Sequence, residues 1–567
     1  MIKTVIEFRD FGFRYKSQTE PTLHEINLCI HEGEKVLVLG PSGSGKSTLA
    51  NCMNGLVPFS YEGQMTGSCV VAGMETRNAS IFSLSKQVGT VLQDSDAQFV
   101  GLSVGEDIAF ALENENLPRL QMLPKVREAA GIVGMGEFLL QVPYELSGGQ
   151  KQKVSLAGVI HDQVNILIFD EPLASLDPQA GMAAIELIDT LHEQGKTIII
   201  IEHRLEDVLH RTVDRIILLN DGRIEFDGKP DELLASTLLM RYGIREPLYI
   251  TALKFAGCSI DAQDRLSSIT HLDLSRFEAD LRTHQARPME RITSVLGDEI
   301  VKVDGVSFAY DTREVLSDVS FSIRKGERVA FVGKNGAGKS TMAKLLCGIV
   351  RPQSGTIMLG SEDSSALSIK ELGGRIGYVM QNPNQMIVKD IIKDEVALAL
   401  YLRARPRLEI DTDVDTALRM CGLYGLRNWP VNVVSYGQRK RVTVAAILAM
   451  HPEVIILDEP TAGQDYHHYT EIMRFLEELN REYGITIIFI THDMHLAIEY
   501  TDRAIVFADG KLVADDSVFK VLSDNKVITK ANLKQTSLYT LAIRLGFAPE
   551  DYIRHFIDNE RMVRTHE

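Results

Sequence analysis

The chain repeats one order of hydrophobic and polar segments in its two halves. Each half opens with a stretch that alternates apolar and polar residues, Val5–Tyr15 and Val301–Tyr310, which predicts a strand with one face buried. Further on come short, mainly apolar runs of the length of buried parallel strands: Lys35–Leu39, Ile166–Phe169 and Thr197–Ile201 in the first half, Arg328–Val332, Val454–Leu457 and Ile485–Thr491 in the second. Such runs alternating with helix-like segments predict two α/β domains, each with a mainly parallel sheet.

A glycine-rich stretch follows the first apolar run of each half and leads into a helix-like segment, Ser47–Leu56 or Ser340–Ile349. Both stretches fit G-x-x-x-x-G-K-[ST]: Gly40-Pro41-Ser42-Gly43-Ser44-Gly45-Lys46-Ser47-Thr48 and Gly333-Lys334-Asn335-Gly336-Ala337-Gly338-Lys339-Ser340-Thr341. Glycines let backbone N–H groups approach phosphate oxygens, and a helix N-terminus favours an anion. We expect both stretches to bind ATP, with Lys46 and Lys339 at the β- and γ-phosphates and the hydroxyls of Ser47 and Ser340 on Mg²⁺. A single match could be a turn that binds nothing, but two matches in the same context argue against that reading.

Paired carboxylates end a later apolar run in each half, as Asp170-Glu171 and Asp458-Glu459. Two acidic residues at the end of a buried strand indicate a function, because burying unpaired charge costs free energy. We expect Asp170 and Asp458 to hold the hydrated Mg²⁺, and Glu171 and Glu459 to orient and polarise the attacking water. His203 and His492 follow the next apolar run and are expected to contact the γ-phosphate; a single histidine there would read as a surface residue.

Two further pairs of residues, one in each half, are weaker evidence for a nucleotide site when each residue is considered alone. Tyr15 and Tyr310 end the first strand of each half and are expected to stack on the purine ring of ATP, the alternative being an aromatic packed on the sheet. Gln93 and Gln381 follow apolar residues and are expected to contact the metal or a water at the γ-phosphate, the alternative being an ordinary loop.

A third pair opens a helical pattern in each half. It reads Leu146-Ser147-Gly148-Gly149-Gln150 in the first half and Val434-Ser435-Tyr436-Gly437-Gln438 in the second. A serine and glycines at a helix start can bind an anion, or the serine can simply cap the helix. We expect ATP to be contacted there by Ser147, Gly149, Gln150, Ser435, Gly437 and Gln438.

Composition narrows the classes of function. The 567 residues are 45% hydrophobic and 24% charged, as in ordinary globular proteins. The start has no signal-peptide shape, and no apolar run reaches the roughly 20 residues that span a bilayer. Six scattered cysteines without a C-x-x-C pair argue against a zinc site or a disulfide framework. A formal net charge of -17 disfavours a nucleic-acid partner.

The ordered set resembles the ATPase subunit of ABC transporters: Walker A, Q-loop, signature, Walker B, D-loop and H-loop, each present twice. Gln93–Phe99, Gln381–Gln385 and Glu202–Val208 add a narrower resemblance to the fused tandem ATPases of energy-coupling-factor importers. This resemblance implies an α/β fold of two tandem P-loop cassettes, each with a mainly parallel sheet core and a helical subdomain, paired head to tail as a pseudo-dimer. In that pairing the Lys46 loop faces a signature that carries Tyr436 where glycine is usual.

The resemblance also implies cofactors and partners. ATP and Mg²⁺ are the expected cofactors, and vitamins or transition-metal ions are the imported substrates of the family. The expected partners are a transmembrane coupling subunit and a substrate-binding membrane subunit, so that the chain would sit peripherally on the cytoplasmic face of the membrane and touch it through partners only. The segments Gln98–Leu112 and Gln385–Leu400 mix apolar residues with acids. We expect grooves there for short helices of a membrane subunit, with its basic residues meeting Glu106, Asp107, Asp394 and Glu395; ordinary subdomain packing is the alternative.

The repeat also predicts the domain boundaries. We expect a first ABC ATPase domain at 1–260 with a short C-terminal helical extension, a linker at 261–297, a second ABC ATPase domain at 298–524 and a C-terminal helical extension at 525–567. Two other classes share the motif order. Twin-cassette ATPases that act on ribosomes usually carry a basic linker, whereas this one is charge-balanced, and fused sugar-importer ATPases typically have a deviant second phosphate loop, whereas both loops here are intact.

Overall fold

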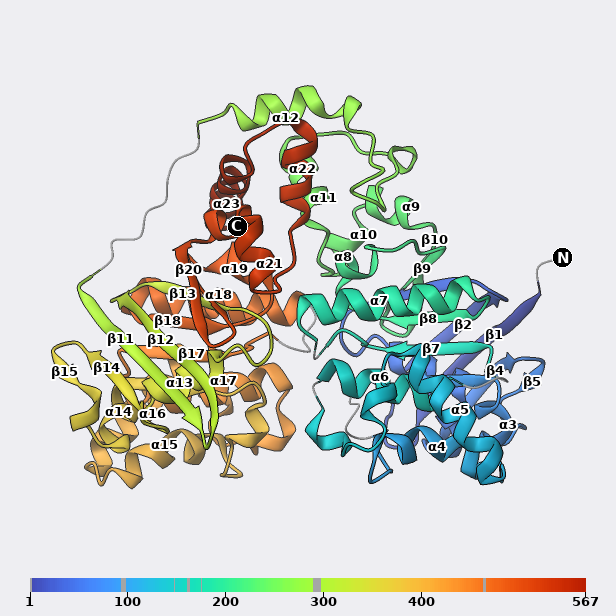
Figure 1. Cartoon of the computed structure of the whole chain (residues 1–567), viewed down its shortest axis with the longest axis horizontal. Helices are drawn as coiled ribbons and strands as arrows, with labels where there is room; N and C mark the ends of the chain where they lie inside the picture. The colour runs from blue at the N-terminus through green and yellow to red at the C-terminus, as the bar shows by residue number, and fades with distance from the viewer. Residues whose placement is uncertain are drawn as a thin grey trace. The chain divides into compact units, whose positions relative to one another are not determined.

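The computed structural model describes residues 3–92, 98–146, 148–160, 164–174, 176–288, 297–461 and 466–566. Two compact units make up the chain (Figure 1). The first consists of Met1–Leu281 with Asp465–His467, and the second of Arg282–Gln464 with His468–Glu567. Each unit holds one copy of the repeated sequence pattern, and each has the predicted α/β fold with a mainly parallel sheet.

In the first unit a six-stranded sheet is built from the apolar runs, in the order β10-β9-β3-β8-β7-β6. All neighbouring pairs are parallel except β10 with β9, which is antiparallel. The strands are β3 (Lys35–Leu39), β6 (Val88–Val91), β7 (Ile166–Asp170), β8 (Thr197–Ile201), β9 (Arg215–Asn220) and β10 (Arg223–Gly228). Because β3, β8 and β7 are neighbours and parallel, the segments that follow them emerge at the same edge of the sheet.

A second, antiparallel sheet lies beside it in the order β2-β1-β4-β5. Its strands are β1 (Thr4–Tyr15), β2 (Leu23–His31), β4 (Gly63–Val71) and β5 (Met74–Glu75). One buried cluster joins both sheets and the helix after β3, with Phe8 from β1, Val38 from β3 and Ile168 from β7 among its members. The alternating pattern of β1 therefore turns its apolar residues toward this core.

Helices complete the first unit. They are α1 (Lys46–Asn54), α2 (Leu56–Phe59), α3 (Ile81–Ser85), α4 (Val104–Asn114), α5 (Arg119–Ile132), α6 (Gly148–Val159), α7 (Pro178–Glu193), α8 (Leu205–Val208), α9 (Pro230–Ala235), α10 (Leu238–Arg241) and α11 (Leu248–Phe255), with 3₁₀ turns at Gly136–Phe138 and Pro143–Glu145. Helices α4, α5 and α6 pack against one another and form a helical layer below the sheet in Figure 1.

The second unit repeats this topology. Its six-stranded sheet has the order β16-β17-β18-β13-β19-β20, and its antiparallel sheet the order β12-β11-β14-β15. The strands are β11 (Glu299–Tyr310), β12 (Arg313–Arg324), β13 (Arg328–Val332), β14 (Ser354–Leu359), β15 (Glu362–Asp363), β16 (Ile376–Val379), β17 (Val454–Asp458), β18 (Thr486–Ile490), β19 (Arg503–Ala508) and β20 (Lys511–Ser517). The helices up to the C-terminal group are α13 (Lys339–Leu346), α14 (Ile369–Arg375), α15 (Ile392–Leu402), α16 (Arg407–Met420), α17 (Tyr436–Leu448), α18 (Tyr466–Tyr483) and α19 (Met494–Tyr500).

The C-terminal group consists of α20 (Val518–Ser523), α21 (Asn525–Lys530), α22 (Ser537–Leu545) and α23 (Pro549–His566). Residues 261–288 contain 3₁₀ turns at Ala262–Asp264 and Leu274–Arg276 and the helix α12 (Glu278–Gln285). Within the second unit, the Arg282 guanidinium donates to the Leu545 carbonyl at 2.8 Å, and the rings of His284 and His555 meet edge to face at 4.9 Å. The start of the second unit is thus held on α22 and α23, and the domain boundaries stay predictions.

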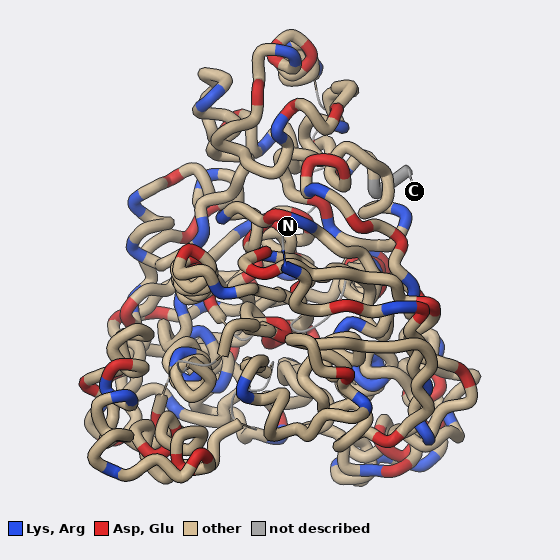
Figure 2. Tube along the Cα trace, turned by 90° about the vertical axis from the view of Figure 1, so that its right-hand side faces the viewer, with Lys and Arg blue, Asp and Glu red and all other residues tan. Residues whose placement is uncertain are grey.

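The charged residues are mixed rather than sorted by sign. Figure 2 shows acidic and basic residues interspersed along the trace of the chain. In the part of the chain that the structure describes, no helix has both the length and the apolarity that crossing a membrane requires.

Candidate nucleotide-binding and catalytic site

The glycine-rich loops connect β3 to α1 and β13 to α13, and their first glycines have no room for a side chain. Gly40 has a φ of 153° and Gly333 a φ of 144°. A Cβ atom on Gly40 would lie 2.2 Å from the Leu219 carbonyl oxygen, and one on Gly333 would lie 2.1 Å from that of Phe507. The last glycines, with φ of 100° and 105°, cap the helices in the left-handed conformation. The loop shape therefore depends on glycine at these positions.

The two loop lysines are buried and bind the loop backbone itself. Lys46 Nζ donates to the carbonyl oxygens of Gly40 and Pro41, both at 2.8 Å. Lys339 Nζ donates to those of Gly333 at 2.6 Å and Lys334 at 3.0 Å. Each ammonium thus lies inside the curve of its loop, at a helix N-terminus, where the backbone N–H groups and the positive charge favour a phosphate.

The other loop residues take supporting places. Ser44 and Ala337 are buried under the loops, and the Ser44 carbonyl accepts from the Gly222 N–H at 3.1 Å. Gly43 and Gly336 have φ of 79° and 78°, so the two loops share one backbone shape. The Lys334 ammonium is paired with Asp509 at 2.5 Å. Pro41, Ser42, Gly45, Asn335, Gly338, Thr48 and Thr341 lie in or directly after these loops.

A carboxylate at the end of β7 or β17, the second strand away from the loop strand in each sheet, faces the helix that follows each loop. The Ser47 hydroxyl donates to Asp170 Oδ1 at 3.4 Å, and Ser340 is hydrogen-bonded to Asp458. Burial raises the pKa of both aspartate carboxyls, and the adjacent glutamates act in the same direction. A hydroxyl and a carboxylate at one point are hard oxygen ligands of the kind that Mg²⁺ takes together with phosphate oxygens.

The glutamates after these aspartates are paired with the predicted histidines. Glu171 and Glu459 have left-handed φ of 49° and 43°, a conformation that costs non-glycine residues free energy and is found at functional sites. His203 Nε2 lies 3.0 Å from Glu171 Oε1, and His492 Nδ1 lies 2.7 Å from Glu459 Oε1. The structure therefore brings carboxylate and imidazole together in both units, at the edge where the phosphate loop ends.

The surroundings of these pairs differ between the units. In the second unit, the Thr491 hydroxyl donates to Glu459 Oε2 at 3.4 Å. In the first unit the corresponding position is Glu202, which is buried and accepts backbone N–H groups of Leu173 at 3.1 Å and His203 at 2.8 Å. Burial raises the pKa of the Glu202 carboxyl, and the nearby charge of Glu171 also raises it.

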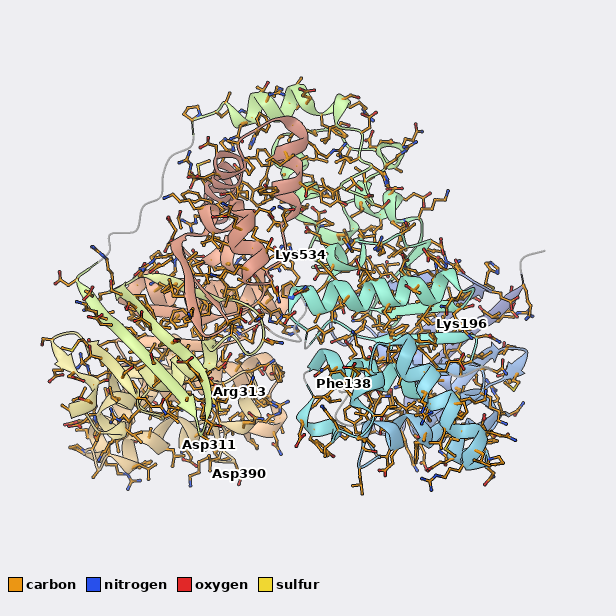
Figure 3. The ribbon with its side chains drawn as sticks, viewed as in Figure 1. Phe138, Lys196, Asp311, Arg313, Asp390 and Lys534 are labelled. Carbon is orange, nitrogen blue, oxygen red and sulfur yellow. The ribbon has the colours of Figure 1, made fainter. Side chains whose placement is uncertain are left out.

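The two tyrosines lie at the ends of β1 and β11. The Tyr15 hydroxyl is 3.0 Å from that of Thr48, and its ring meets Phe13 edge to face at 4.8 Å. Tyr310 is 41% exposed and lies at the tip of the β11–β12 hairpin, where Figure 3 labels Asp311 in the turn and Arg313 at the start of β12. Tyr310 is thus accessible to a purine ring, whereas the Tyr15 hydroxyl is tied to the phosphate-loop helix.

The glutamine loops are described only in part, because Gln93 lies outside the described residues. In the first unit Gln98 binds the end of β6 and the residue after it: its side chain accepts from the Leu92 N–H at 3.0 Å and donates to the Thr90 carbonyl at 3.1 Å. In the second unit Gln381 is exposed. Its carbonyl oxygen accepts from the hydroxyl of Tyr436 at 3.3 Å.

The helix-start motifs open α6 and α17, and Ser147 lies outside the described residues. Ser435 caps α17: its hydroxyl accepts from the Gln438 N–H at 3.2 Å while the Gln438 side chain accepts from the Ser435 N–H at 3.0 Å. Such a reciprocal cap is the structural alternative that the sequence left open. Gly437, Gly149 and Gln150 lie in the first turns of these helices.

The expectation that Asp107 and Glu395 face basic residues of a partner is wrong. Both side chains are buried. Asp107 Oδ1 accepts the N–H groups of Val100 at 2.9 Å and Gly101 at 3.2 Å, and Glu395 Oε2 accepts those of Val388 at 2.8 Å and Lys389 at 2.7 Å. These acids fix the loop before α4 and α15 because buried N–H groups need acceptors.

Sequence reasoning also missed two contacts of the second unit. Tyr378 donates its hydroxyl hydrogen to Asp458 Oδ2 at 2.5 Å. Lys440, buried in α17, donates to the Pro460 carbonyl oxygen at 2.6 Å. Aligning the two halves pairs Lys440 with Gln152 and Tyr378 with Thr90, and this difference between the copies was the available signal.

A glycine-rich loop between a parallel strand and a helix, with its lysine, a carboxylate at the end of another strand of the same sheet and a glutamate–histidine pair beyond, defines a P-loop nucleotide-binding protein. The chain has two such sites, one in each unit.

Comparison with known proteins gives the family. The model of the ABC transporter family matches residues 23–174 and 316–462, and a model described as ATP-binding cassette cobalt transporter matches 236–308. The chain is 52% identical over 568 residues to an ABC transporter ATP-binding protein of Enterococcus faecalis, covering 100% of both chains. It is 53% identical over 566 residues to one of Clostridium perfringens, covering 99% of this chain and 100% of the other. The chain belongs to the ABC transporter ATP-binding proteins and is an ATPase with two cassettes.

Among solved structures, cbiO1 from Clostridium perfringens, described as part of the ABC transporter complex cbiONQ, is 34% identical. The match covers 43% of this chain and 99% of that one, with a TM-score of 0.39.

Proposed function

We propose that this chain is the ATP-hydrolysing subunit of an importer of the energy-coupling-factor type, which takes up a transition-metal ion or a vitamin. The observation that carries the proposal is that each unit brings together a loop lysine, a serine hydroxyl with an aspartate, and a glutamate with a histidine, the groups that ATP hydrolysis would need. The matched family model for residues 236–308, described as that of a cobalt transporter, favours a metal ion such as cobalt as the cargo.

The arrangement fits ATP with Mg²⁺. A Cβ atom at Gly40 or Gly333 would collide with backbone, so the loops keep the close approach that phosphates need. Lys46 and Lys339 would bind the β- and γ-phosphates. The hydroxyls of Ser47 and Ser340, the carboxylates of Asp170 and Asp458, and the side chains of Gln93 and Gln381 would hold Mg²⁺, which supplies charge neutralisation at the phosphates.

Hydrolysis would depend on the carboxylates beyond the metal site. Glu171 and Glu459 would accept a hydrogen bond from the attacking water and orient it toward the γ-phosphate. His203 and His492 are already within hydrogen-bond distance of these carboxylates and would keep them in place. Tyr15 and Tyr310 would contact the adenine, and Ser147, Gly149, Gln150, Ser435, Gly437 and Gln438 would contact ATP from the helix starts.

A groove in the first unit offers a place for a membrane partner. A cavity of about 760 Å³ lies between Leu92 and Gln98 on one side and the helices α3, α4 and α6 on the other. Phe82, Val100 and Phe110 line it and are 53%, 62% and 44% exposed. Since Asp107 is occupied by its own loop, the contact would be mainly apolar. The occupant would be a short amphipathic helix of a transmembrane coupling subunit, which in turn would bind a substrate-binding membrane subunit and place this chain on the cytoplasmic face of the membrane.

The test is to isolate the tagged full-length chain from membranes and identify what remains bound. Transport is then measured as uptake of radioactive cobalt by cells that carry the chain or the Glu171→Gln/Glu459→Gln double variant. Co-purification of membrane proteins and uptake that the double variant abolishes would support the proposal. Sedimentation with ribosomes would favour the ribosomal class instead. Sugar uptake that depends on the chain would favour a sugar importer.

The groove is tested separately with Val100→Asp. This substitution should release the membrane partners while ATP binding persists. The matched control is Leu120→Asp on α5, an apolar side chain that is 87% exposed and does not line this cavity. Retention of the partners by Val100→Asp would rule out this groove as the docking site.

A further inference from the structure

The first two turns of α17 are tied to the glutamine loop of their own unit by three side chains. The Tyr436 hydroxyl donates to the Gln381 carbonyl oxygen at 3.3 Å, and Lys440 Nζ donates to the same oxygen at 3.4 Å. Arg439 Nη1 donates to Asn384 Oδ1 at 2.9 Å. Because Tyr436 and Lys440 are four residues apart, they lie on one face of the helix, and this face contacts the glutamine loop.

Lys440 extends the same connection to the catalytic strand. Its ammonium donates to the carbonyl oxygens of Glu459 at 3.3 Å and Pro460 at 2.6 Å, and its side chain is buried. An ammonium has three hydrogens, and these two carbonyls, with that of Gln381, match them one for one. One of the three belongs to Glu459, whose left-handed backbone needs support from its surroundings.

The first unit differs in sequence at both helix positions. Gly148 stands where Tyr436 stands, and a glycine has no hydroxyl to donate. Gln152 stands where Lys440 stands and donates its side-chain amide to the Pro172 carbonyl. The contact to the proline carbonyl is thus common to both units, whereas the tyrosine hydroxyl and the ammonium are features of the second unit.

We propose that Tyr436 and Lys440 are positioning residues for ATP hydrolysis in the second unit. They hold the backbones of Gln381 and Glu459 in a fixed position relative to the start of α17. The side chains that act on the metal and the water then keep a fixed relation to each other. This inference rests on the proposed catalytic role of Glu459. It also gives Tyr436 a structural role in its own unit, as a donor to the Gln381 backbone.

The experiment measures ATPase kinetics of the full-length chain, purified with the membrane proteins that accompany it, in a Lys46→Ala background that isolates the second site. Tyr436→Phe removes one hydroxyl and keeps the ring, and Lys440→Gln installs the residue of the first unit. We expect Tyr436→Phe to lower kcat about twofold to tenfold, as for one neutral hydrogen bond. Lys440→Gln should lower kcat at least tenfold, since it removes a charge-assisted connection.

The two residues donate to one carbonyl oxygen, so the double variant should lose less than the product of the two single losses. KM for ATP and the melting temperature should stay close to those of the background protein in all three. The matched control is Arg441→Gln, the next residue on α17, which pairs with Glu471 at 2.7 Å and should keep kcat.

Each result has a distinct meaning. If both single variants keep kcat within twofold, or if affinity for ATP falls as much as kcat, the positioning role is refuted. An equal loss of kcat in Arg441→Gln would show that the helix as a whole, and not the contact to Gln381 and Glu459, is what matters. The catalytic assignment is checked by Glu459→Gln in the same background. If this variant stays active, the proposed function of Glu459 fails, whatever the tyrosine and lysine variants do.

Discussion

Tyr378→Phe should weaken Mg²⁺ binding at the second site, so that ATP hydrolysis there needs a higher Mg²⁺ concentration. The Tyr378 hydroxyl donates to Asp458 Oδ2 at 2.5 Å, and phenylalanine keeps the ring but removes this donor. A hydrogen bond to a charged group contributes about 1.5–3 kcal/mol, and because Asp458 is half-buried we take about 2 kcal/mol. If the bond holds the carboxylate for the metal, its loss corresponds to about thirtyfold in Mg²⁺ affinity.

The same contact determines the direction in which the pH dependence of ATP hydrolysis should shift in Tyr378→Phe. The hydrogen bond from Tyr378 lowers the pKa of the Asp458 carboxyl, against burial, which raises it. Removing the donor therefore raises the pKa of Asp458. As the pH falls, Asp458 in Tyr378→Phe becomes protonated earlier, and activity should be lost at a higher pH than in the parent protein.

The assay is ATP hydrolysis as a function of Mg²⁺ concentration and of pH, in the Lys46→Ala background. The half-saturating Mg²⁺ concentration should rise about tenfold to thirtyfold. The matched control is Thr90→Val with Lys339→Ala, because the Thr90 hydroxyl accepts from Asn54 Nδ2 at 3.2 Å. It should leave the Mg²⁺ curve in place. An unchanged Mg²⁺ curve in Tyr378→Phe, with ATP still bound, would refute the idea that this hydrogen bond prepares Asp458 for the metal.

Three further outcomes are expected. Glu171→Gln with Glu459→Gln should bind ATP with normal affinity and lose hydrolysis, and turnover at the parent rate would show that another group activates the water. Tyr310→Ala should weaken ATP binding by about 1–3 kcal/mol, as measured for other bases stacked on aromatic rings, while Tyr310→Phe should be nearly silent; equal losses would assign the effect to the hydroxyl. His284 and His555 have pKa values lowered by burial, so the unfolded chain takes up protons first and the second unit should lose stability as the pH falls below about 6.5. Melting curves between pH 5 and 8 check this, with His284→Gln as the variant that should flatten the dependence.

The sequence predicted two mainly parallel sheets and the residues that follow their strands. In the structure β3, β8 and β7 lie side by side and parallel, and this arrangement brings the residues after them, Lys46, Asp170 and His203, to one edge of the sheet. The repeat made the same prediction for the second unit, and its sheet has the corresponding strand order. Local pattern and topology were enough here because each predicted residue stands directly at the end of an element.

The hydrogen-bond partners of individual side chains could not be predicted from the sequence. Asp107 and Glu395 looked like exposed acids at a helix start, yet they accept backbone N–H groups of the preceding loop. Which groups an acid meets depends on the path of that loop, and no periodicity records the path. Lys440 shows the converse: a lysine expected in water is buried, because three carbonyls happen to converge where its amine lies.

The two sites have the same backbone arrangement, but the charged groups around Glu171 differ from those around Glu459. In the first unit a buried carboxylate, Glu202, lies close enough to Glu171 for their charges to interact unfavourably. In the second unit a hydroxyl takes that position, and the Lys440 ammonium donates to the Glu459 carbonyl. A negative neighbour raises the free energy of an ionised base, whereas a positive one lowers it. The charged groups beside the two glutamates therefore differ, and a difference in turnover between the two sites can arise within each unit from these neighbours alone.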